Sequence, residues 1–365
     1  MNYILHYVNK MHRGGMESLI MNLYRNIDSS EYQFHFAVHT DVKADFDDEI
    51  EKLGGKIIVF PNHRSNPIRY RKVWNEFWRE NKDKYLLFHF HTNSLANIES
   101  IKAAKDNGFN NIIVHAHSSY ASKGKLQIVH DFAHKRNQKY VAKNDVYKIA
   151  VSEKAKNWVF GNNQEVEIVN NGINYSDFNF STSKRATIRN QFSIGNDEIV
   201  IGQVGNFNPV KNHKFSLKVF KEFTKTNNNS KLLFVGGGPR IDEIRQIVKN
   251  ENLEDKVIFV GIVSNVSDYL SAMDIFIFPS IFEGLGLVAV EAQVNGLPVL
   301  YSNTVPKDIE ISSNVCSLSI DENPVVWANK LNDLITVRSS TKNLNSKFEI
   351  SSTVRNITDI YLKFN

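Results

Sequence analysis

FEGLGLVAVEAQVNG, residues 282–296, is the stretch of this chain that says most about its fold. The apolar run Ile275–Pro279 just before it predicts a short buried strand that ends at a proline. The run Leu287–Val294 predicts an apolar helix that the chain enters through Gly284 and Gly286. In open α/β folds, ligands bind in the crevice at the carboxyl ends of the strands, where such a turn lies. We therefore expect a ligand site at this turn.

Two glutamates frame the turn. Glu283 lies at the strand-to-helix crevice, and Glu291 lies about two turns along the helix, on nearly the same face, at a rise of ~1.5 Å per residue. Backbone N–H groups at a helix start suit phosphate groups, and carboxylates suit sugar hydroxyls. Two acids placed in this way are able to hold a sugar and a ribose on either side of a diphosphate. The stretch therefore indicates a nucleotide-sugar enzyme.

The size and composition of the chain exclude several classes of protein. At 365 residues it exceeds the usual size of one hydrophobic core, so we expect two domains. No apolar run approaches the ~18 residues of a membrane helix, and the opening MNYILHYVNK lacks the basic and apolar regions of a signal peptide. The single cysteine, Cys316, excludes an internal disulfide and a cysteine zinc site. These features predict a cytoplasmic location.

The net charge of +5 is unevenly placed along the chain. Residues 1–172 carry 24 Lys and Arg against 19 Asp and Glu, whereas residues 173–365 carry 20 of each. The excess is concentrated in the stretches Arg64–Arg79 and Lys123–Lys143. A basic face attracts anionic lipid head groups or a lipid-diphosphate acceptor, although a pair of solvated helices explains the charge equally well. Nucleic acid is disfavoured as a partner, because no nucleic-acid-binding motif accompanies the charge.

Strand and helix patterns alternate along the chain, which predicts parallel sheets with helices on both faces. In the first half the predicted strands are Tyr3–Val8, Phe34–His39, Lys56–Phe60, Leu86–Phe90, Asn111–His115, Lys148–Val151 and Val166–Val169. In the second half they are Ile199–Val204, Lys231–Val235, Val257–Val260, Asp274–Phe278 and Pro298–Tyr301, with helices at Phe215–Thr226 and Ile241–Asn250. We therefore predict the α/β class, with two doubly wound, Rossmann-like domains and a cleft between them.

The domain bounds follow from the same pattern. We expect an N-terminal domain over residues 1–172 and a C-terminal domain over residues 173–345, with the polar stretch Asn174–Lys184 as a connector. Apolar residues recur at helical spacing in Ser351–Phe364. The last residues, 346–365, are therefore expected to hold a helix that packs back on the N-terminal domain.

Residues at strand ends in the first domain are candidates for ligand contacts. Gly14 and Gly15 follow the first strand and open a helix, so their backbone N–H groups either approach a phosphate or only shape a turn. His117, in the stretch VHAHSS, ends another strand, and its position fits a ligand contact and a structural role equally well. His89 and His91 end a strand in the same way, and for them we favour a structural role.

The second domain offers Lys211, in the segment GNFNPVKNH after its first strand, where a lysine would meet a phosphate. The run Gly236–Pro239 after the next strand either cradles phosphate or forms a tight strand-to-helix turn. Asp45, Asp47 and Asp48 contain a D-x-D spacing, but they open a predicted helix, so we interpret them as its solvated first turn and predict no metal site. The sequence has no P-loop, GxGxxG, Ser-His-Asp, HExxH or paired-cysteine signature.

Taken together, these segments resemble glycosyltransferase family 4, the retaining GT-B enzymes that build bacterial polysaccharides. The resemblance covers nearly the whole chain and rests on GGME at 14–17, the histidine of HAHSS, NGI at 171–173, residues 204–213, residues 234–239 and above all Glu283-x7-Glu291. The opening KMHRGGMESLIMNLYRNID is most similar to the capsular and exopolysaccharide transferases of the group. The resemblance implies a GT-B fold, with an acceptor-binding N-terminal domain and a nucleotide-sugar-binding C-terminal domain.

The resemblance also implies roles for individual residues. His117 would contact the transferred sugar near the reacting carbon, Lys211 would neutralise the departing phosphate, and Glu283 would hold sugar hydroxyls. Gly15 would meet the donor diphosphate or shape the acceptor pocket. The donor-binding positions would be Gly15, Asn206, Lys211, Gly261, Val266, Glu283, Gly284, Leu285, Gly286, Leu287 and Glu291, with the ribose on Glu291 and the base in the loop Gly261–Val266. Such enzymes need neither a metal ion nor another cofactor.

One departure from the family pattern concerns Asn206, which stands where the family usually has an arginine five residues before the lysine. Arginine offers a charged bidentate fork, whereas asparagine offers a neutral dipole. The loss of a charge-assisted contact would cost ~1.5–3 kcal/mol of leaving-group stabilisation. Arg13 and Arg240 are candidates, by position, to supply the missing charge; otherwise the enzyme would be slow or inactive.

The sequence therefore predicts a peripheral enzyme at the inner face of the cytoplasmic membrane, bound through its basic N-terminal domain. It would move a hexose or N-acetylhexosamine from a nucleotide-sugar, with UDP-sugar favoured, to a lipid-linked saccharide of a capsule or exopolysaccharide. The first alternative is a non-catalytic GT-B protein that binds a nucleotide or glycan and supports another transferase. The second is a GT-B epimerase acting on a UDP-sugar.

Overall fold

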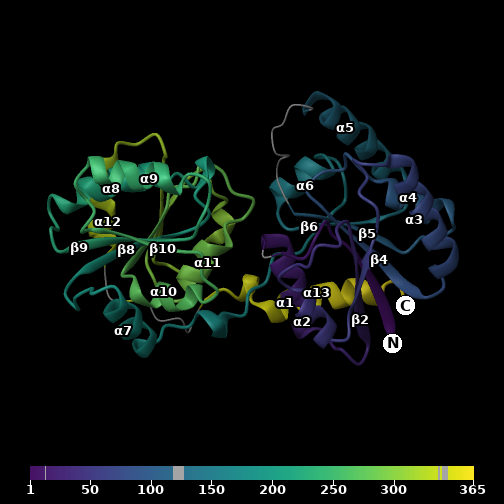
Figure 1. Cartoon of the computed structure of the whole chain (residues 1–365), viewed down its shortest axis with the longest axis horizontal. Helices are drawn as coiled ribbons and strands as arrows, with labels where there is room; N and C mark the ends of the chain where they lie inside the picture. The colour runs from purple at the N-terminus through teal and green to yellow at the C-terminus, as the bar shows by residue number, and fades with distance from the viewer. Residues whose placement is uncertain (13, 118–126, 336–337, 339–343) are drawn as a thin grey trace. The chain divides into compact units, whose positions relative to one another are not determined.

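The computed structural model describes residues 1–12, 14–117, 127–335, 338 and 344–365 (Figure 1). Arg13, Lys123 and Lys125, which the sequence singled out, lie outside the described residues. The chain divides into one unit of residues 1–173 with 348–365 and a second unit of residues 174–347. Each unit holds one parallel sheet flanked by helices, so the predicted α/β class with two Rossmann-like domains is confirmed.

The sheet of the first unit has the strand order β3-β2-β1-β4-β5-β6-β7, and its neighbouring strands are parallel. Its strands are β1 (Asn2–Tyr7), β2 (Tyr32–Val38), β3 (Lys56–Val59), β4 (Tyr85–Thr92), β5 (Ile112–Ala116), β6 (Tyr147–Ala150) and β7 (Glu167–Ile168). The helices of this unit are α1 (Gly15–Asn26), α2 (Asp47–Lys52), α3 (Pro67–Asn81), α4 (Glu99–Asp106), α5 (Gln127–Lys143), α6 (Glu153–Val159) and α13 (Ile350–Leu362). The order reverses between β1 and β4, at the kind of switch point where α/β sheets bind ligands.

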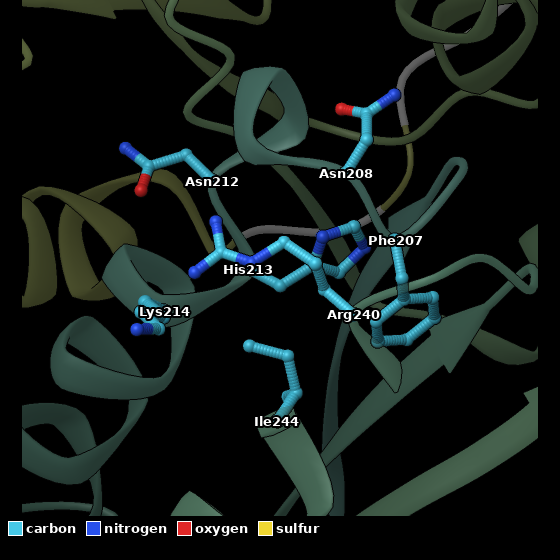
Figure 2. Close-up of a pocket in the computed structure, with 7 residues that line it drawn as sticks. All are labelled: Phe207, Asn208, Asn212, His213, Lys214, Arg240 and Ile244. Carbon is cyan, nitrogen blue, oxygen red and sulfur yellow. The ribbon is translucent and has the colours of Figure 1, made fainter. Parts of the chain in front are cut away.

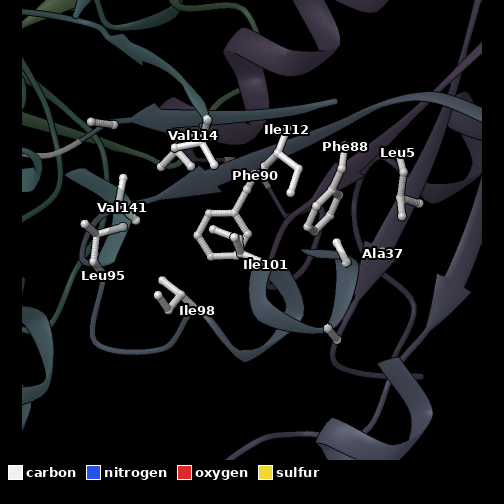
Figure 3. Packing of buried hydrophobic residues seen from close by; sticks show 14 of the residues in the cluster. Leu5, Ala37, Phe88, Phe90, Leu95, Ile98, Ile101, Ile112, Val114 and Val141 are labelled. Carbon is white, nitrogen blue, oxygen red and sulfur yellow. The ribbon is translucent and has the colours of Figure 1, made fainter. Parts of the chain in front are cut away.

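Two apolar layers hold the helices against this sheet, because successive residues of a strand point to opposite faces. On one face, Leu5, Phe88 and Phe90 pack with apolar residues of α3, α4 and α5 (Figure 3). On the other face, Ile4 and Leu87 pack with apolar residues of α1 and α13. The strand residues of both layers are almost completely buried, which leaves little room for change in this unit.

Helix α13 belongs to the first unit although it follows the second unit in sequence. The backbone N–H of Ile173 donates to Phe348 O at 2.8 Å, and the N–H of Ile350 donates back to Ile173 O at 2.9 Å. Further along the helix, the Tyr361 hydroxyl lies 2.8 Å from Nδ1 of His89 on β4. These contacts fix both ends of α13 against the first sheet.

The sheet of the second unit has the order β10-β9-β8-β11-β12-β13 and is also parallel. Its strands are β8 (Ile199–Val204), β9 (Ser230–Val235), β10 (Val257–Gly261), β11 (Ile275–Phe278), β12 (Val299–Ser302) and β13 (Val315–Leu318). The helices are α7 (Thr182–Gln191), α8 (His213–Thr224), α9 (Ile241–Asn250), α10 (Val266–Ala272), α11 (Leu287–Val294) and α12 (Pro324–Leu334), and the 3-10 turns are η1 (Tyr175–Phe178), η2 (Pro209–Lys211), η3 (Lys307–Ile309) and η4 (Ser346–Phe348). The order reverses between β8 and β11, so the loops that follow these strands lie side by side.

The stretch Asn174–Lys184, which was predicted as a connector, contains regular structure of its own. This stretch holds η1 and the first residues of α7. The helix begins here because the Ser181 hydroxyl accepts a hydrogen bond from the backbone N–H of Lys184 at 3.3 Å, as an N-cap does. The polar residues that suggested a connector are the cap and the exposed first turn of a helix.

A buried arginine joins α7 to the residue just before β11, and no pattern in the sequence predicted this contact. The side chain of Arg189, on α7, is almost completely buried. Its guanidinium donates to Oδ2 of Asp274 at 2.6 Å and to the backbone oxygens of Gly195, Glu198 and Ala272 at 2.7–3.1 Å. These four hydrogen bonds, one of them to a carboxylate, compensate the buried charge and tie α7 to the residue before β11.

Replacement of Arg189 by methionine is expected to lower the free energy of unfolding by roughly 3–5 kcal/mol, because it leaves Asp274 without its buried partner. Urea unfolding of the full chain measures this loss. The matched control is Arg185→Met, since the more exposed Arg185 also donates to Asp274, at 2.7 Å. An equal loss in both variants would show that burial of Arg189 adds nothing.

Candidate functional site

The loop after β8 places Lys211 at the switch point of the second sheet. The Asn208 side chain accepts from the backbone N–H of Lys211 at 3.1 Å and so closes the turn η2. Buried Gln203 donates to Lys211 O at 2.7 Å and is itself held by the hydroxyl of Ser216 at 2.7 Å. The lysine stem passes over Gly205, where a Cβ atom would lie 3.3 Å from it. Backbone and stem are therefore both fixed.

The Lys211 ammonium meets Glu283, which comes from the loop after β11. Nζ lies 2.6 Å from Oε1 of Glu283, and the two side chains are only 18% and 13% exposed. The ammonium also lies 4.9 Å from the ring centroid of Phe278, within reach of a cation–π attraction. The backbone N–H of Ile281 donates to Val210 O at 2.8 Å and joins the two loops. A preformed cation and a carboxylate thus share one point at the edge of the sheet.

Helix α11 begins directly behind this pair. Gly286 has a φ of +93°, and a Cβ atom there would lie 2.9 Å from the Phe278 ring, so this position requires glycine. Gly284, Leu285 and Leu287 follow Glu283 around this tight entry. Within the described part of the chain, no side chain caps the start of the helix. The backbone dipole at this end favours an anion such as a phosphate.

Glu291 lies just over one turn into α11, and its side chain is partly buried. Burial raises the pKa of Glu291 from 4.5 to about 7, and the nearby charge of Lys211 offsets part of that rise. In the protein without ligand, this carboxyl group therefore keeps its proton to a higher pH than an exposed glutamate does. Lys211, Glu283 and Glu291 are thus brought together in the second unit, as the motif spacing led us to expect.

The loops after β9 and β10 complete this edge of the sheet. The backbone N–H of Phe207 donates to Gly237 O, and that of Gly236 donates to Gly261 O, both at 2.8 Å. Gly236, Gly237 and Gly261 therefore allow the loops after β8, β9 and β10 to approach one another closely. Gly261 has a φ of +89° and open space around it, and Val266 begins α10 a few residues later. The two residues bound the loop that was expected to receive a base.

In the first unit, Gly15 is the first residue of α1, and nothing lies within 4 Å of a Cβ atom built on it. A Cβ atom on Gly14 would lie 2.4 Å from the carboxylate of Glu17, which folds back over the helix start. Burial raises the pKa of Glu17. An acid therefore already lies at this helix start.

His117 follows β5 directly, and its backbone N–H donates to Thr92 O at 3.0 Å. Its Nε2 atom lies 2.8 Å from Nδ1 of His91. Burial lowers the pKa of His117 well below its ordinary value, so the ring is neutral. The residues that follow, Ser118 and Ser119, lie outside the described part of the chain. His117 and Gly15 are thus at the carboxyl edge of the first sheet, in a different unit from Lys211.

Comparison with known proteins places this geometry in context. Residues 13–177 match the family model described as Glycosyltransferase Family 4, and residues 184–349 match the model described as Glycosyl transferases group 1. Each of the two models thus matches one unit of the chain, and the fold is that of GT-B structures. Among the matched solved structures, the Anabaena protein Alr3699/HepE in complex with UDP has a TM-score of 0.80 at 17% identity over the full length of both chains.

Two relatives that cover most of this chain are named as glycosyltransferases. This chain is 29% identical over 336 residues to a Bacillus subtilis protein that carries the name "Putative glycosyltransferase EpsF", with 89% of this chain and 85% of the relative covered. It is 25% identical over 374 residues to the capsular polysaccharide biosynthesis glycosyltransferase CapH of Staphylococcus aureus, with 98% of each chain covered. Both relatives therefore extend over the two domains.

Asn206 remains without a substitute charge that the structure can identify. Its Oδ1 lies where a Cβ atom on Gly238 would come within 2.4 Å, so the side chain packs on the glycine turn. The Arg240 guanidinium forks onto Glu243 at 2.5 and 2.9 Å, and Lys214 pairs with the same carboxylate. Those two cations lower the pKa of Glu243 to about 2. Arg240 is therefore engaged, and Arg13 lies outside the described residues.

A small cavity lies beside this arginine at the start of α8. Figure 2 shows the residues gathered around it, which are Phe207, Asn208, Asn212, His213, Lys214, Arg240 and Ile244. Its volume of about 30 Å³ suits a water molecule rather than a sugar. Lys211, Glu283 and Glu291 do not line it, so this cavity is separate from the candidate site.

The D-x-D acids form local contacts, as their interpretation as a helix start requires. The Asp47 side chain accepts from the backbone N–H of Ala44 at 2.8 Å, and Asp48 pairs with Lys43 at 2.7 Å. Asp45 pairs with His12 at 3.1 Å.

A group of histidines around His117 was not predicted from the sequence. The alternate histidines at 89 and 91 and at 115 and 117 were a signal for it, because alternate residues of a strand share one face.

Proposed function

We propose that this protein is a retaining glycosyltransferase that moves a hexose or an N-acetylhexosamine from a UDP-sugar to a lipid-linked saccharide. The observation that carries the proposal is the pair of Lys211 and Glu283, 2.6 Å apart at the switch point of the second sheet. A cation for a diphosphate and a carboxylate for sugar hydroxyls stand together there. The uncapped start of α11 and the carboxyl group of Glu291 extend the same site.

In the proposed reaction, an acceptor hydroxyl attacks the anomeric carbon from the side on which the diphosphate leaves, so the configuration is retained. The bond from the anomeric carbon to the phosphate oxygen breaks, and that oxygen takes the acceptor's proton. Lys211 neutralises the leaving diphosphate, Glu283 holds sugar hydroxyls, and His117 contacts the sugar near the reacting carbon. Positioning and electrostatic stabilisation carry the catalysis, so we propose that no metal ion is needed.

The rest of the donor is assigned to the backbone around this pair. The diphosphate lies near the N–H groups of Leu285–Leu287, the ribose hydroxyls bind Glu291, and the base enters the loop Gly261–Val266. UDP is favoured because the similar HepE structures hold UDP and UDP-glucose. An Escherichia coli relative, 23% identical over 210 residues, is named as a UDP-Gal:alpha-D-GlcNAc-diphosphoundecaprenol alpha-1,3-galactosyltransferase. That name supports a UDP-sugar donor and a lipid-diphosphate acceptor, and CapH supports a capsular product.

The exposed side chains of α5 support the proposal that the protein binds to a membrane surface. Ile128, Val129 and Phe132 are 87%, 64% and 71% exposed. Exposed basic residues continue along the helix, at Lys135, Arg136, Lys139 and Lys143. An exposed apolar group beside basic side chains is typical of a helix that lies in the surface of an anionic membrane. From this surface on α5, we propose peripheral binding at the inner face of the membrane. None of the described helices has the length and apolar character needed to cross a bilayer.

Replacement of Ile128 and Phe132 by serine is expected to weaken binding to phosphatidylglycerol-containing vesicles about tenfold or more, because it removes the apolar area that enters the lipid. Sedimentation with vesicles, with pure phosphatidylcholine for comparison, measures the effect. The control is Ile68→Ser, which removes an 84% exposed isoleucine from the other basic stretch, on α3. Loss of binding with the control alone would place the membrane contact on α3 instead.

The function itself is tested by incubating the full chain with a panel of UDP- and GDP-sugars, with and without EDTA. Saturation-transfer NMR detects binding, and free nucleotide reports slow hydrolysis of the donor. One donor should bind and turn over, and Lys211→Ala and Glu291→Ala should weaken both signals. Lys221→Ala serves as the control, because Lys221 is a half-exposed surface lysine paired with Glu251.

Other outcomes point to the alternatives. Binding without turnover, even with membrane extract as acceptor, would favour a non-catalytic partner protein, for which Asn206 is the supporting feature. Conversion of the donor to an epimer without acceptor would favour an epimerase. Activity abolished by EDTA would contradict the metal-independent mechanism, and absence of any nucleotide-sugar binding would contradict the proposed function as a whole.

A further inference from the structure

Five histidines lie on one face of the first sheet, beside the switch point between β1 and β4. They are His6 on β1, His89 and His91 on β4, and His115 and His117 on β5 or directly after it. The first four are at most 4% exposed. Alternate residues of a strand share one face, so Ile4 and Leu87 lie on the same face as these histidines. Both residues pack under α1 and α13. The histidines therefore form an inner polar layer beneath these helices.

Their ring nitrogens join end to end in two chains. In the first chain, His117 Nε2 lies 2.8 Å from His91 Nδ1, and His91 Nε2 lies 2.9 Å from His6 Nδ1. In the second, the Tyr361 hydroxyl lies 2.8 Å from His89 Nδ1, and His89 Nε2 lies 3.1 Å from His115 Nδ1. These separations are those of hydrogen bonds between nitrogen atoms. Only the first chain reaches His117, the histidine at the edge of the sheet.

All members of the first chain are neutral. Burial lowers the pKa of His6 to about 3 and lowers those of His91 and His117 well below their ordinary value. A neutral imidazole carries one proton and offers one lone pair. Three rings thus share three protons, and the two bonds between them use two. The third proton must lie at one end, either on Nε2 of His6 or on Nδ1 of His117.

The inner end is a poor place for that proton. Nε2 of His6 is buried and has no hydrogen-bond partner among the described residues, and its ring packs 4.1 Å from the ring of Phe34. Buried N–H groups without an acceptor are rarer in proteins than acceptors without a donor. Nδ1 of His117 is also buried and without a partner in the described part of the chain, but the residue as a whole is partly exposed and lies at the carboxyl edge of the sheet, where a ligand can supply an acceptor.

We propose that His91 and His6 are positioning residues that hold His117 in the tautomer with its proton on Nδ1. His6 donates from Nδ1 to His91, His91 donates from Nδ1 to His117, and His117 is left with an N–H group to donate to an oxygen of the transferred sugar. The proposal deepens the proposed function, because the sugar is its ligand. A lone buried histidine at position 117 would be free to adopt either tautomer.

Metal binding is the rival explanation, since the ring nitrogens of His6, His89 and His91, and those of His91, His115 and His117, lie within 4.8 Å of one another. Zinc bound tetrahedrally at about 2.0–2.1 Å sets its ligand atoms roughly 3.3 Å apart. Both nitrogen pairs in the first chain are closer than that. The nitrogen atoms that a metal would need are already occupied by each other.

The test uses the full chain labelled with ¹⁵N-histidine, and nitrogen–proton correlation NMR distinguishes the protonated nitrogen of each ring. A His117→Gln spectrum identifies the signals of His117. We expect the wild-type ring to carry its proton on Nδ1, His91→Leu to give a mixture of tautomers, and His91→Asn, which keeps a donor near the Nδ1 position, to restore the wild-type pattern. The control is Tyr361→Phe, which breaks the second chain and should leave His117 unchanged.

Turnover of the donor gives the second readout. His91→Leu is expected to lower kcat about 10–100-fold, the range found when hydrogen-bond partners that orient metal-binding histidines are removed, with nucleotide affinity unchanged. His91→Asn should recover most of the activity, and Tyr361→Phe should lose little. If the wild type turns over no donor, the proposed function fails, but the tautomer still decides this inference. A proton on Nε2 of wild-type His117, or stoichiometric Zn²⁺ binding that His91→Leu removes, would overturn it.

Discussion

Replacement of Lys211 by methionine is expected to lower release of nucleotide from the donor by about 10²–10³-fold, the loss that follows removal of one preorganised charge contact in a transition state. Negative charge develops on the leaving diphosphate. Among the described residues, Lys211 is the only cation that forms an ion pair with Glu283 at this point of the sheet. Methionine keeps the apolar stem over Gly205 and removes only the ammonium. Donor hydrolysis and UDP affinity, measured side by side, separate loss of turnover from loss of binding.

Glu283 provides a way to separate catalysis from folding. Lys211→Met leaves a 13% exposed carboxylate without its partner, which should lower the free energy of unfolding by roughly 1–3 kcal/mol. Adding Glu283→Gln should return most of that stability, because the uncompensated charge is gone, but should not return activity. Recovery of both properties would mean that Lys211 serves only to hold Glu283. Lys221→Met, which breaks a surface pair with Glu251, is the matched control.

Much of the fold was predictable from the sequence because its elements repeat local patterns. The strand Ile199–Val204 and the helices Ile241–Asn250 and Leu287–Val294 have the predicted bounds, since each is a clean apolar run or a regular apolar stripe. The edge strand Val315–Leu318 was missed because a short strand with a serine and a cysteine carries little pattern. Helix α7 was missed because its exposed, capped start is as polar as a loop.

The sequence predicted the site residues that directly follow a strand. It did not predict the contacts that form only when distant parts of the chain pack together. Lys211 and Glu283 lie in the loops that follow the neighbouring strands β8 and β11, so their meeting follows from the topology of a parallel sheet. The bond between His6 and His91 joins residues 85 positions apart and has no motif. The environment of Glu291 was equally hidden, because its pKa depends on what covers the carboxyl group and not on its neighbours in sequence.

Replacement of Glu291 by glutamine is expected to stabilise the protein at alkaline pH while it weakens nucleotide binding. The folded protein holds a proton on Glu291 up to a pKa of about 7, whereas the unfolded chain releases it near 4.5. Between these values the folded state binds more protons, so stability is full below about 4.5, falls as pH rises and levels off above about 7. Glutamine has no proton to lose, so the variant should be more stable at pH ~8 by roughly 1–3 kcal/mol, after allowance for solvent at this half-buried residue.

Nucleotide binding should respond in the opposite direction, because ribose hydroxyls need the charged carboxylate as acceptor. Glu291→Gln should weaken UDP binding by about 10–100-fold above pH ~7, the equivalent of one or two charge-assisted hydrogen bonds. Wild-type affinity should fall as pH drops below ~7 and the acid gains its proton, whereas affinity of the variant should follow only the titration of UDP itself, which both proteins share.

Urea unfolding and calorimetric titration at pH ~5.5 and ~8 measure the two effects in the same samples, and Glu254→Gln, at an exposed glutamate of the same unit, is the control. A gain in stability without a loss of UDP binding would show that Glu291 is buried for packing and does not touch the ribose. A loss of binding without the pH-dependent gain would show that its carboxyl group is charged before the nucleotide arrives. Both effects together would mean that the protein keeps a destabilising acid because its ligand requires it, which is the signature of a binding site and not of a core.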